Sequence, residues 1–267
     1  SVDGLSQQDH AYDAALDGQL CFTADGGNGL TVYDLTQDPT DLDGPFVLSN
    51  LGGSTGEKAP LGRATGIALW SSPSTIRNYA LIAAGPRGIG VVEVTAPEAP
   101  QLVKVFEPIK IEDGSVGKAD GRAVDVKVYG DYAIFSYDSF GILSYSVADL
   151  IEPLPEGIDP TKIWNHQGGV LHYDYRPEAL AELRLRDIPE YAEYGGGALY
   201  MSLARETGKL VLYTAYGVAG VLQSDWSDPA DPAVMFLHPT PGEATAVATH
   251  HGRMYVADGS AGLIWFE

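Results

Sequence analysis

An apolar segment that begins with glycine occurs five times along the chain. The copies are Gly29–Leu35, Gly88–Val94, Gly141–Val147, Gly220–Trp226 and Gly262–Glu267. Each copy follows a second short apolar run, and turn residues separate the two. Short apolar runs bounded by turn residues are typical of β-strands. A β-type segment that repeats along the whole chain predicts a radial β architecture.

A third apolar run precedes each of these pairs. The third runs begin at His10, Arg63, Arg122, Gly197 and Glu243, and alanine is the second residue of all five. Turn residues such as Asp17-Gly18 and His251-Gly252 connect the third run to the next one, which predicts a hairpin in each repeat.

A proline-containing turn follows the glycine segment and leads into a fourth apolar run. Thr95–Pro100 precedes Gln101–Phe106, and Ser227–Pro232 precedes Ala233–Leu237. Proline lacks a backbone N–H, so it fits an outer edge strand, where no ladder hydrogen bond is lost. Four strands in each repeat are the content of one propeller blade.

The repeats therefore predict an all-β fold, a single five-bladed β-propeller of four-stranded antiparallel blades. The expected blades are residues 10–61, 62–120, 121–165, 197–241, and 242–267 completed by 1–9. A six-bladed ring is the alternative, because the interval between the third and fourth copies is the longest. Residues 166–196 in that interval contain no further hairpin with a glycine segment, which favours five blades.

Two segments fall outside the repeat. Arg176–Arg186 has proline near its start, carboxylates early and arginines late, an order that favours a helix. We therefore expect a small helical insertion at about residues 166–196. The last repeat has no fourth strand after Glu267, and an unpaired edge promotes aggregation. We expect residues 1–9 to supply that outer strand, so that both termini share one blade.

The repeat resembles a known type. Gly121–Val147, Arg253–Trp265 and Ser227–Pro232 are similar to the LVIVD-type repeat of bacterial and archaeal propeller proteins. The resemblance implies a β-propeller that is exported or attached to the cell surface. It implies no particular activity, because a fold alone does not confer a function.

The charge of the chain excludes several partner classes. Lys and Arg number 16 against 36 Asp and Glu, which gives a formal net charge of −20. Such a surface repels nucleic acid and anionic lipid. The acidic, lysine-poor composition and the LVIVD resemblance favour an extracellular, periplasmic or cell-surface location after removal of a signal segment. No apolar stretch of the sequence is long enough to span a membrane.

Cys21 is the only cysteine, so no internal disulfide can form. Covalent haem attachment through a Cys-x-x-Cys-His motif is excluded for the same reason. Cys21 aligns with apolar residues of the other repeats, which indicates a small buried hydrophobic side chain. We expect no cofactor, with calcium as the one candidate.

The third runs are expected to be the innermost strands, so their equivalent positions would form rings around a central channel. The first position supplies His10, Arg63, Arg122 and Glu243. Two guanidinium groups and an imidazole at one level would bind a small anion such as a carboxylate or sulfate. The alternative is that the arginines pair with nearby carboxylates and connect the blades.

Calcium ligands are concentrated in two turns of the first repeat. Asp25 and Asn28 lie in one turn, and Asp41 and Asp43 lie in the other. Neither turn matches the spacing of an EF-hand loop. Asp and Gly are also favoured in turns that bind no ion.

No catalytic motif supports an enzyme. The alternative is a channel-centred hydrolase, glycosidase-like or metal-assisted, that uses Asp13, Asp125 and Glu243. The function that the sequence favours is a non-catalytic binding or scaffolding propeller that presents a loop face to a protein partner. A third option, an accessory subunit of an extracellular redox assembly, has no residue that supports it.

Overall fold

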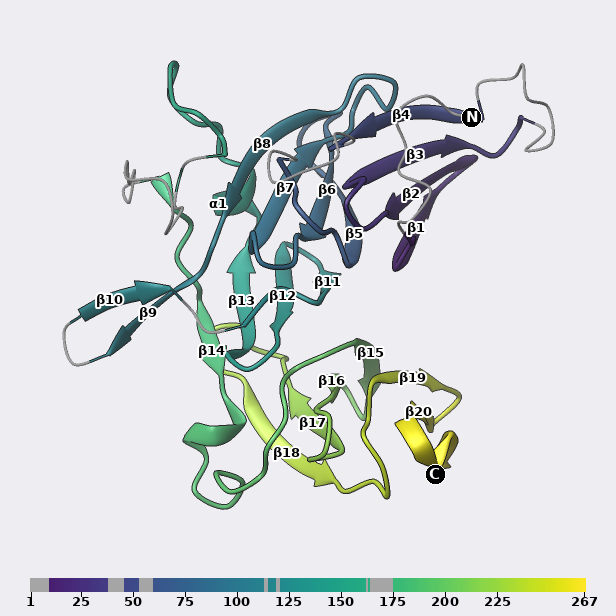
Figure 1. The fold of residues 1–267 in the computed structure, drawn as a ribbon, viewed down its shortest axis with the longest axis vertical. Coiled ribbons are helices and arrows are strands. Elements are labelled where there is room, and N and C mark those ends of the chain that lie inside the picture. The colour runs from purple at the N-terminus through teal and green to yellow at the C-terminus, as the bar shows by residue number, and fades with distance from the viewer. Residues whose placement is uncertain are drawn as a thin grey trace. The chain divides into compact units, whose positions relative to one another are not determined.

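The computed structural model describes residues 10–37, 46–52, 60–112, 115–118, 121–161, 163 and 175–267. Almost all of its regular structure is antiparallel β-sheet (Figure 1). The chain divides into two compact units, Ser1–Ala119 with Ala148–Pro177, and Asp120–Val147 with Glu178–Glu267. Two of the larger sheets belong to the first unit and three belong to the second.

The first unit contains two four-stranded sheets in which neighbouring strands follow chain order. The first sheet, blade 1, consists of β1 (Asp13–Asp17), β2 (Leu20–Ala24), β3 (Leu30–Asp34) and β4 (Val47–Leu51). The second sheet, blade 2, consists of β5 (Gly66–Ser71), β6 (Asn78–Ala83), β7 (Ile89–Glu93) and β8 (Gln101–Phe106). A separate hairpin follows, formed by β9 (Ile109–Glu112) and β10 (Ser115–Lys118).

The second unit contains three sheets, again in chain order. Blade 3 consists of β11 (Asp125–Tyr129), β12 (Tyr132–Tyr137), β13 (Gly141–Ser146) and β14 (Ala181–Leu183). Blade 4 consists of β15 (Met201–Glu206), β16 (Lys209–Ala215), β17 (Val221–Asp225) and β18 (Ala233–His238). Blade 5 has three described strands, β19 (Ala246–His250), β20 (Arg253–Ala257) and β21 (Leu263–Phe266). The fourth strand expected from residues 1–9 lies outside the described residues.

The helix expected at residues 176–186 does not form. Ala181–Leu183 is instead the strand β14, which pairs with β13 as the outer strand of blade 3. A 3-10 turn follows at Leu185–Asp187. Leu183 and Leu185 are both buried while Arg184 between them is less so, and this alternation fits an extended chain. The only α-helix among the described residues is α1 (Val147–Ile151), directly after β13.

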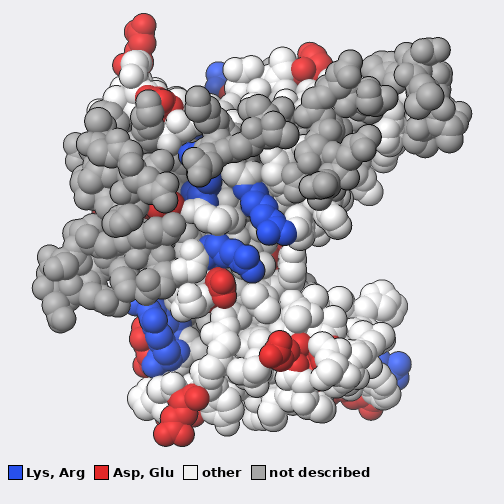
Figure 2. Space-filling view, in the orientation of Figure 1, with Lys and Arg blue, Asp and Glu red and all other residues white. Residues whose placement is uncertain are grey.

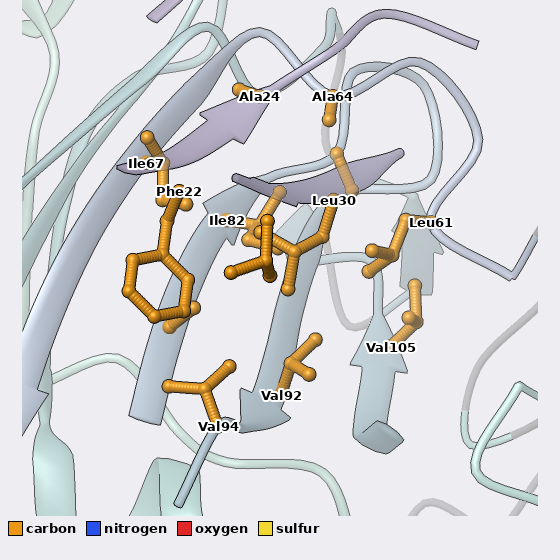
Figure 3. Close-up of a cluster of buried hydrophobic side chains, with 13 residues drawn as sticks. Phe22, Ala24, Leu30, Leu61, Ala64, Ile67, Ile82, Val92, Val94 and Val105 are labelled. Atoms are coloured by element: carbon orange, nitrogen blue, oxygen red, sulfur yellow. The ribbon is translucent and has the colours of Figure 1, made fainter. Parts of the chain in front are cut away.

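Apolar residues of adjacent blades pack against each other inside each unit. Phe22 and Leu30 of blade 1 meet Ile67, Ile82 and Val92 of blade 2 in one buried cluster (Figure 3). In the second unit, Ile134 of blade 3 packs in a cluster with Leu212 and Trp226 of blade 4. A further cluster contains Val221 of blade 4 and Val256 of blade 5. The seam between two neighbouring blades is therefore where most of the core lies.

In three repeats, the alanine at the second position of the third run lies where two blades meet. Ala64, Ala198 and Ala244 are completely buried. Each forms an antiparallel bridge with a turn residue of the preceding blade, namely Gly26, Asp138 and Gly217 respectively. The backbones of adjacent blades approach closely at these bridges, which explains why a small side chain recurs at this position.

Glycine is required where the repeated segment begins. Gly88 has a φ of +85°, and a Cβ atom there would clash with the carbonyl oxygen of Phe106 in the neighbouring strand β8. L-residues rarely adopt this backbone conformation, so both the torsion and the contact select glycine. The repeat found in the sequence thus reflects a turn geometry shared by the blades.

Candidate functional site

The four residues predicted to bind an anion are all exposed. His10 and Arg63 belong to the first unit, and Arg122 and Glu243 belong to the second. A guanidinium N–H of Arg63 donates to the hydroxyl of Tyr12, and the guanidinium carbon lies 5.0 Å from the Tyr12 ring centroid. Nε of Arg122 lies 3.8 Å from Oδ2 of Asp138. The anion site that would unite these residues stays a prediction.

The carboxylate of Asp13 connects blades 1 and 2. Its Oδ2 accepts a hydrogen bond of 3.1 Å from the backbone N–H of Ile67 in β5, and its Oδ1 accepts one of 2.9 Å from Ala14. The first of these bonds runs from one inner strand to the next. Asp13 therefore holds two blades in register through a backbone N–H, whereas the connection considered from the sequence was an arginine paired with a carboxylate.

Asp125 makes the same connection between blades 3 and 4. Its side chain is 1% exposed, and its Oδ2 accepts a 2.8 Å hydrogen bond from the backbone N–H of Met201. Its Oδ1 accepts from the N–H of Val126 at 2.7 Å and from Nζ of Lys127 at 2.8 Å. A buried carboxylate needs such partners to remain charged. The recurrence of Asp at this position in two repeats was the sequence signal for this role.

Glu243 differs from these two aspartates because its side chain is exposed. The three carboxylates of the hydrolase alternative therefore lie in dissimilar environments. General acid–base catalysis needs a carboxyl group within reach of a substrate proton. The oxygens of Asp13 and Asp125 already accept hydrogen bonds from the backbone.

The turn that contains Asp25 and Asn28 holds a small polar network. Oδ2 of Asp25 accepts a 2.9 Å hydrogen bond from Oγ1 of Thr31 and a 3.3 Å bond from Nδ2 of Asn28. Asp25 is 6% exposed, so this network braces the turn between β2 and β3. Asp41 and Asp43 lie outside the described residues. Within the described part of the chain, no three His, Cys, Asp or Glu residues are grouped as a metal site.

Cys21 is half-buried, and burial raises the pKa of its thiol. A raised pKa lowers the fraction of reactive thiolate at neutral pH. The side chain lies on β2, where its aligned partners in the other blades are apolar. No helix in the described chain is both long enough and apolar enough to cross a membrane.

Tyr213 is a further polar residue that sequence reasoning missed. Its hydroxyl contacts both carboxylate oxygens of Glu206, at 2.8 and 2.9 Å, and Nε2 of Gln223 donates to it at 3.1 Å. Burial and the neighbouring carboxylate raise the pKa of Tyr213. These contacts link β15, β16 and β17 within blade 4.

A family model of the LVIVD repeat matches one part of the repeated sequence. Residues 120–135, which contain β11 and the start of β12, match the LVIVD repeat. The chain carries an LVIVD repeat. The match covers one hairpin of blade 3. No curated protein matches the chain.

Solved structures define the fold. One is the β-propeller domain of Cps50 (Swd1) from Myceliophteria thermophila, which has 11% sequence identity and a TM-score of 0.54. That match covers 97% of this chain and 71% of the other. Another is BBS1N, solved in complex with ARL6DN, with 9% identity and a TM-score of 0.54. It covers 98% of this chain and 66% of the other. The chain therefore has a β-propeller fold.

Proposed function

We propose that this LVIVD-repeat propeller is a binding or scaffolding protein that presents its loops to a protein partner outside the cell. The observation that carries the proposal is the bonding of Asp13 and Asp125. Both aspartates accept hydrogen bonds from backbone N–H groups of the next blade. Two of the three carboxylates that a channel hydrolase would use are thereby engaged in holding blades together.

The charge of the chain supports a basic partner. The formal net charge is −20. Figure 2 shows acidic side chains at several separate places on one face, and Lys and Arg side chains gathered near the middle of that view. A field of one sign increases the rate at which an oppositely charged partner associates and repels acidic competitors. We infer a partner whose contact surface is rich in Lys and Arg.

Rigid blades with variable loops suit this role, because a stable scaffold fixes the positions of the loops that make contact. The hairpin β9–β10 extends the connection after blade 2. Blade 3 is interrupted between β13 and β14 by the longest connection within any of the sheets. Both connections enlarge the surface that loops provide.

Affinity capture from the native source, run beside a panel of hydrolase substrates, tests the proposal. We expect a stable partner at a fixed stoichiometry and no turnover. Turnover that is lost in Asp125→Asn and Glu243→Gln variants, with no captured partner, would overturn the proposal in favour of the hydrolase. Asp131→Asn, an exposed turn carboxylate, is the matched control for the loss of charge.

A further inference from the structure

A cavity of about 320 Å³ lies between blades 1 and 2, entirely within the first unit. It opens where the hairpins β1–β2 and β5–β6 turn. Phe22 and Val94 form its apolar floor, and Figure 3 shows these two side chains at the same end of the buried cluster. Leu16, Leu20, Leu69 and Trp70 form its walls. Its volume lies at the lower end of the range of ligand pockets.

Polar groups surround the mouth of this cavity. Asp17, Ser71, Asn78 and Thr95 line it. Among the described residues, the carboxylate of Asp17 has no hydrogen bond or ion pair, and neither the Ser71 hydroxyl nor the Asn78 side-chain amide is hydrogen-bonded. Thr95 accepts the backbone N–H of Asn78 at 3.0 Å, which leaves its hydroxyl proton available. An apolar pocket with a few convergent polar groups is the usual form of a binding site.

Blades 3 and 4 supply an internal comparison, because their seam is built the same way. The N–H of Val94 donates to the carbonyl of Asn78 at 2.8 Å, and that of Trp226 donates to the carbonyl of Leu210 at 2.7 Å. The N–H of Leu210 donates to Oγ of Ser227 at 3.0 Å, as that of Asn78 does to Thr95. Trp226 and Leu210 are therefore the structural equivalents of Val94 and Asn78.

The strand registers extend this equivalence to the mouth of the cavity. Asp17 and Tyr129 are each the last paired residue of an inner strand before its hairpin turn. Ser71 pairs with Asn78, and Arg205 pairs with Leu210. Tyr129 and Arg205 thus occupy in blades 3 and 4 the positions that Asp17 and Ser71 occupy in blades 1 and 2.

In the second unit these positions are filled by the protein itself. Trp226 is completely buried and Leu210 is 6% exposed. The guanidinium carbon of Arg205 lies 5.1 Å from the Tyr129 ring centroid, a cation–π contact. These four side chains fill the seam at this place, and we call them the plug: Trp226, Leu210, Tyr129 and Arg205. In the first unit the four equivalent residues are smaller or polar, and the cavity takes the place of the plug.

We propose that this cavity binds an aromatic side chain flanked by a basic residue on the protein partner. This inference rests on the proposed binding function and names its contact site. The aromatic ring would lie over Phe22 and Val94, as Trp226 lies in the other seam, and the cation would meet Asp17 and the face of Trp70. Aromatic and arginine side chains are also the residues that contribute most to binding energy in interfaces.

Titration of the blocked tripeptide Arg-Trp-Arg into ¹⁵N-labelled protein tests the site. The readout is the indole N–H signal of Trp70, assigned by comparison with Trp70→Phe. We expect this signal to shift with saturation, and Arg-Ala-Arg and Glu-Trp-Glu to bind about tenfold more weakly or not at all. A Trp70 signal that does not move at millimolar Arg-Trp-Arg, or that moves equally with all three peptides, overturns the proposal.

Two variants copy the plug of the second unit into the first. Val94→Trp should fill the cavity and abolish the shift. Asn78→Leu, which is nearly isosteric, should weaken binding even if the larger substitution disturbs folding. Asp17→Asn should weaken Arg-Trp-Arg binding and its salt dependence, whereas Asp131→Asn should change neither. Binding that is unaltered in Asn78→Leu and Asp17→Asn contradicts the assignment.

Capture of the partner separates this inference from the proposed function. If wild type and a folded Asn78→Leu variant retain the partner equally, the cavity is not the contact site, although the binding function stands. If the peptide binds and no partner is captured, the cavity is a ligand site and the proposed scaffolding function fails. Loss of the partner in the variant supports both.

Discussion

At the scale of single residues, the structure changes the role of the inner-strand aspartates. Their recurrence at one position was visible in the sequence, and so was the possibility of ties between blades. The hydrogen-bond donors of these aspartates could not be predicted, because every residue except proline has a backbone N–H. The pattern of side chains therefore does not indicate which N–H is bound. The arginines that the sequence offered as partners of these carboxylates are exposed, and Arg122 lies near Asp138 while Arg63 packs on Tyr12.

Replacing Asp125 with alanine should destabilise the protein. The change leaves the buried N–H of Met201 without its acceptor and removes the partner of Lys127. An unsatisfied buried donor costs about 1–3 kcal/mol, and we expect a loss of about 2 kcal/mol in the free energy of unfolding. Urea unfolding measures it. Asp131→Ala, an exposed turn residue, should change stability by less than about 0.5 kcal/mol. Equal stabilities of the two variants would contradict the tie between blades.

His238 gives a residue-scale prediction about pH. Burial lowers the pKa of this imidazole, which packs on Phe236 at 4.7 Å and lies 2.9 Å from Oε1 of Gln223 through Nε2. Below the ordinary histidine pKa the unfolded chain binds the proton more readily than the folded chain. Stability should therefore fall as pH drops from 7 through the lowered folded pKa. Thermal melts of wild type and His238→Gln at pH 7 and 5 should show a smaller acid loss in the variant.

At the scale of elements, the sequence located the first three strands of every repeat but missed the fourth strand of blade 3. The shared turn geometry fixes glycine and alanine at set positions, so those three strands repeat visibly. β14 has three residues, lies far along the chain from β13, and is flanked by alanine, glutamate, leucine and arginine. These are helix-forming residues, and the open edge of β13 overrode that preference.

Truncating β14 tests its place in the sheet. Leu183 is 8% exposed, pairs with Ile142 of β13 and packs in the buried cluster shared by blades 3 and 4. Leu183→Ala should lower the free energy of unfolding by about 2–3 kcal/mol. Leu180→Ala is the control, because that side chain is 38% exposed and should cost less than about 1 kcal/mol. A larger effect at Leu180 than at Leu183 would show that the strand assignment is wrong.

At the scale of the whole molecule, the repeats predicted five antiparallel sheets in chain order, and the structure confirms a propeller fold. Closure of the last blade stays a prediction. Among the described residues β21 has one neighbour, β20, whereas the outer strand of a complete blade would cover its other edge. Sequence alone could suggest residues 1–9 only because other repeats, such as the second and the fourth, carry a fourth apolar run after the glycine segment.

If residues 1–9 form the expected outer strand, deleting residues 1–8 should lower the melting temperature by more than about 5 °C, because β21 would lose the backbone hydrogen bonds to that strand. Differential scanning calorimetry measures the change. Replacing the same residues with a Gly/Ser sequence of equal length controls for chain length and should destabilise equally. A melting temperature unchanged by the deletion would mean that another segment completes the blade.

We propose that this acidic propeller functions by binding a basic protein partner. Calorimetric titration of the purified partner against the wild-type protein, at low and at physiological salt, tests that claim most directly. We predict a complex of fixed stoichiometry whose dissociation constant rises with salt, because opposite charges attract across the interface. A titration without heat at either salt concentration, together with turnover of a hydrolase substrate by the same sample, would contradict it.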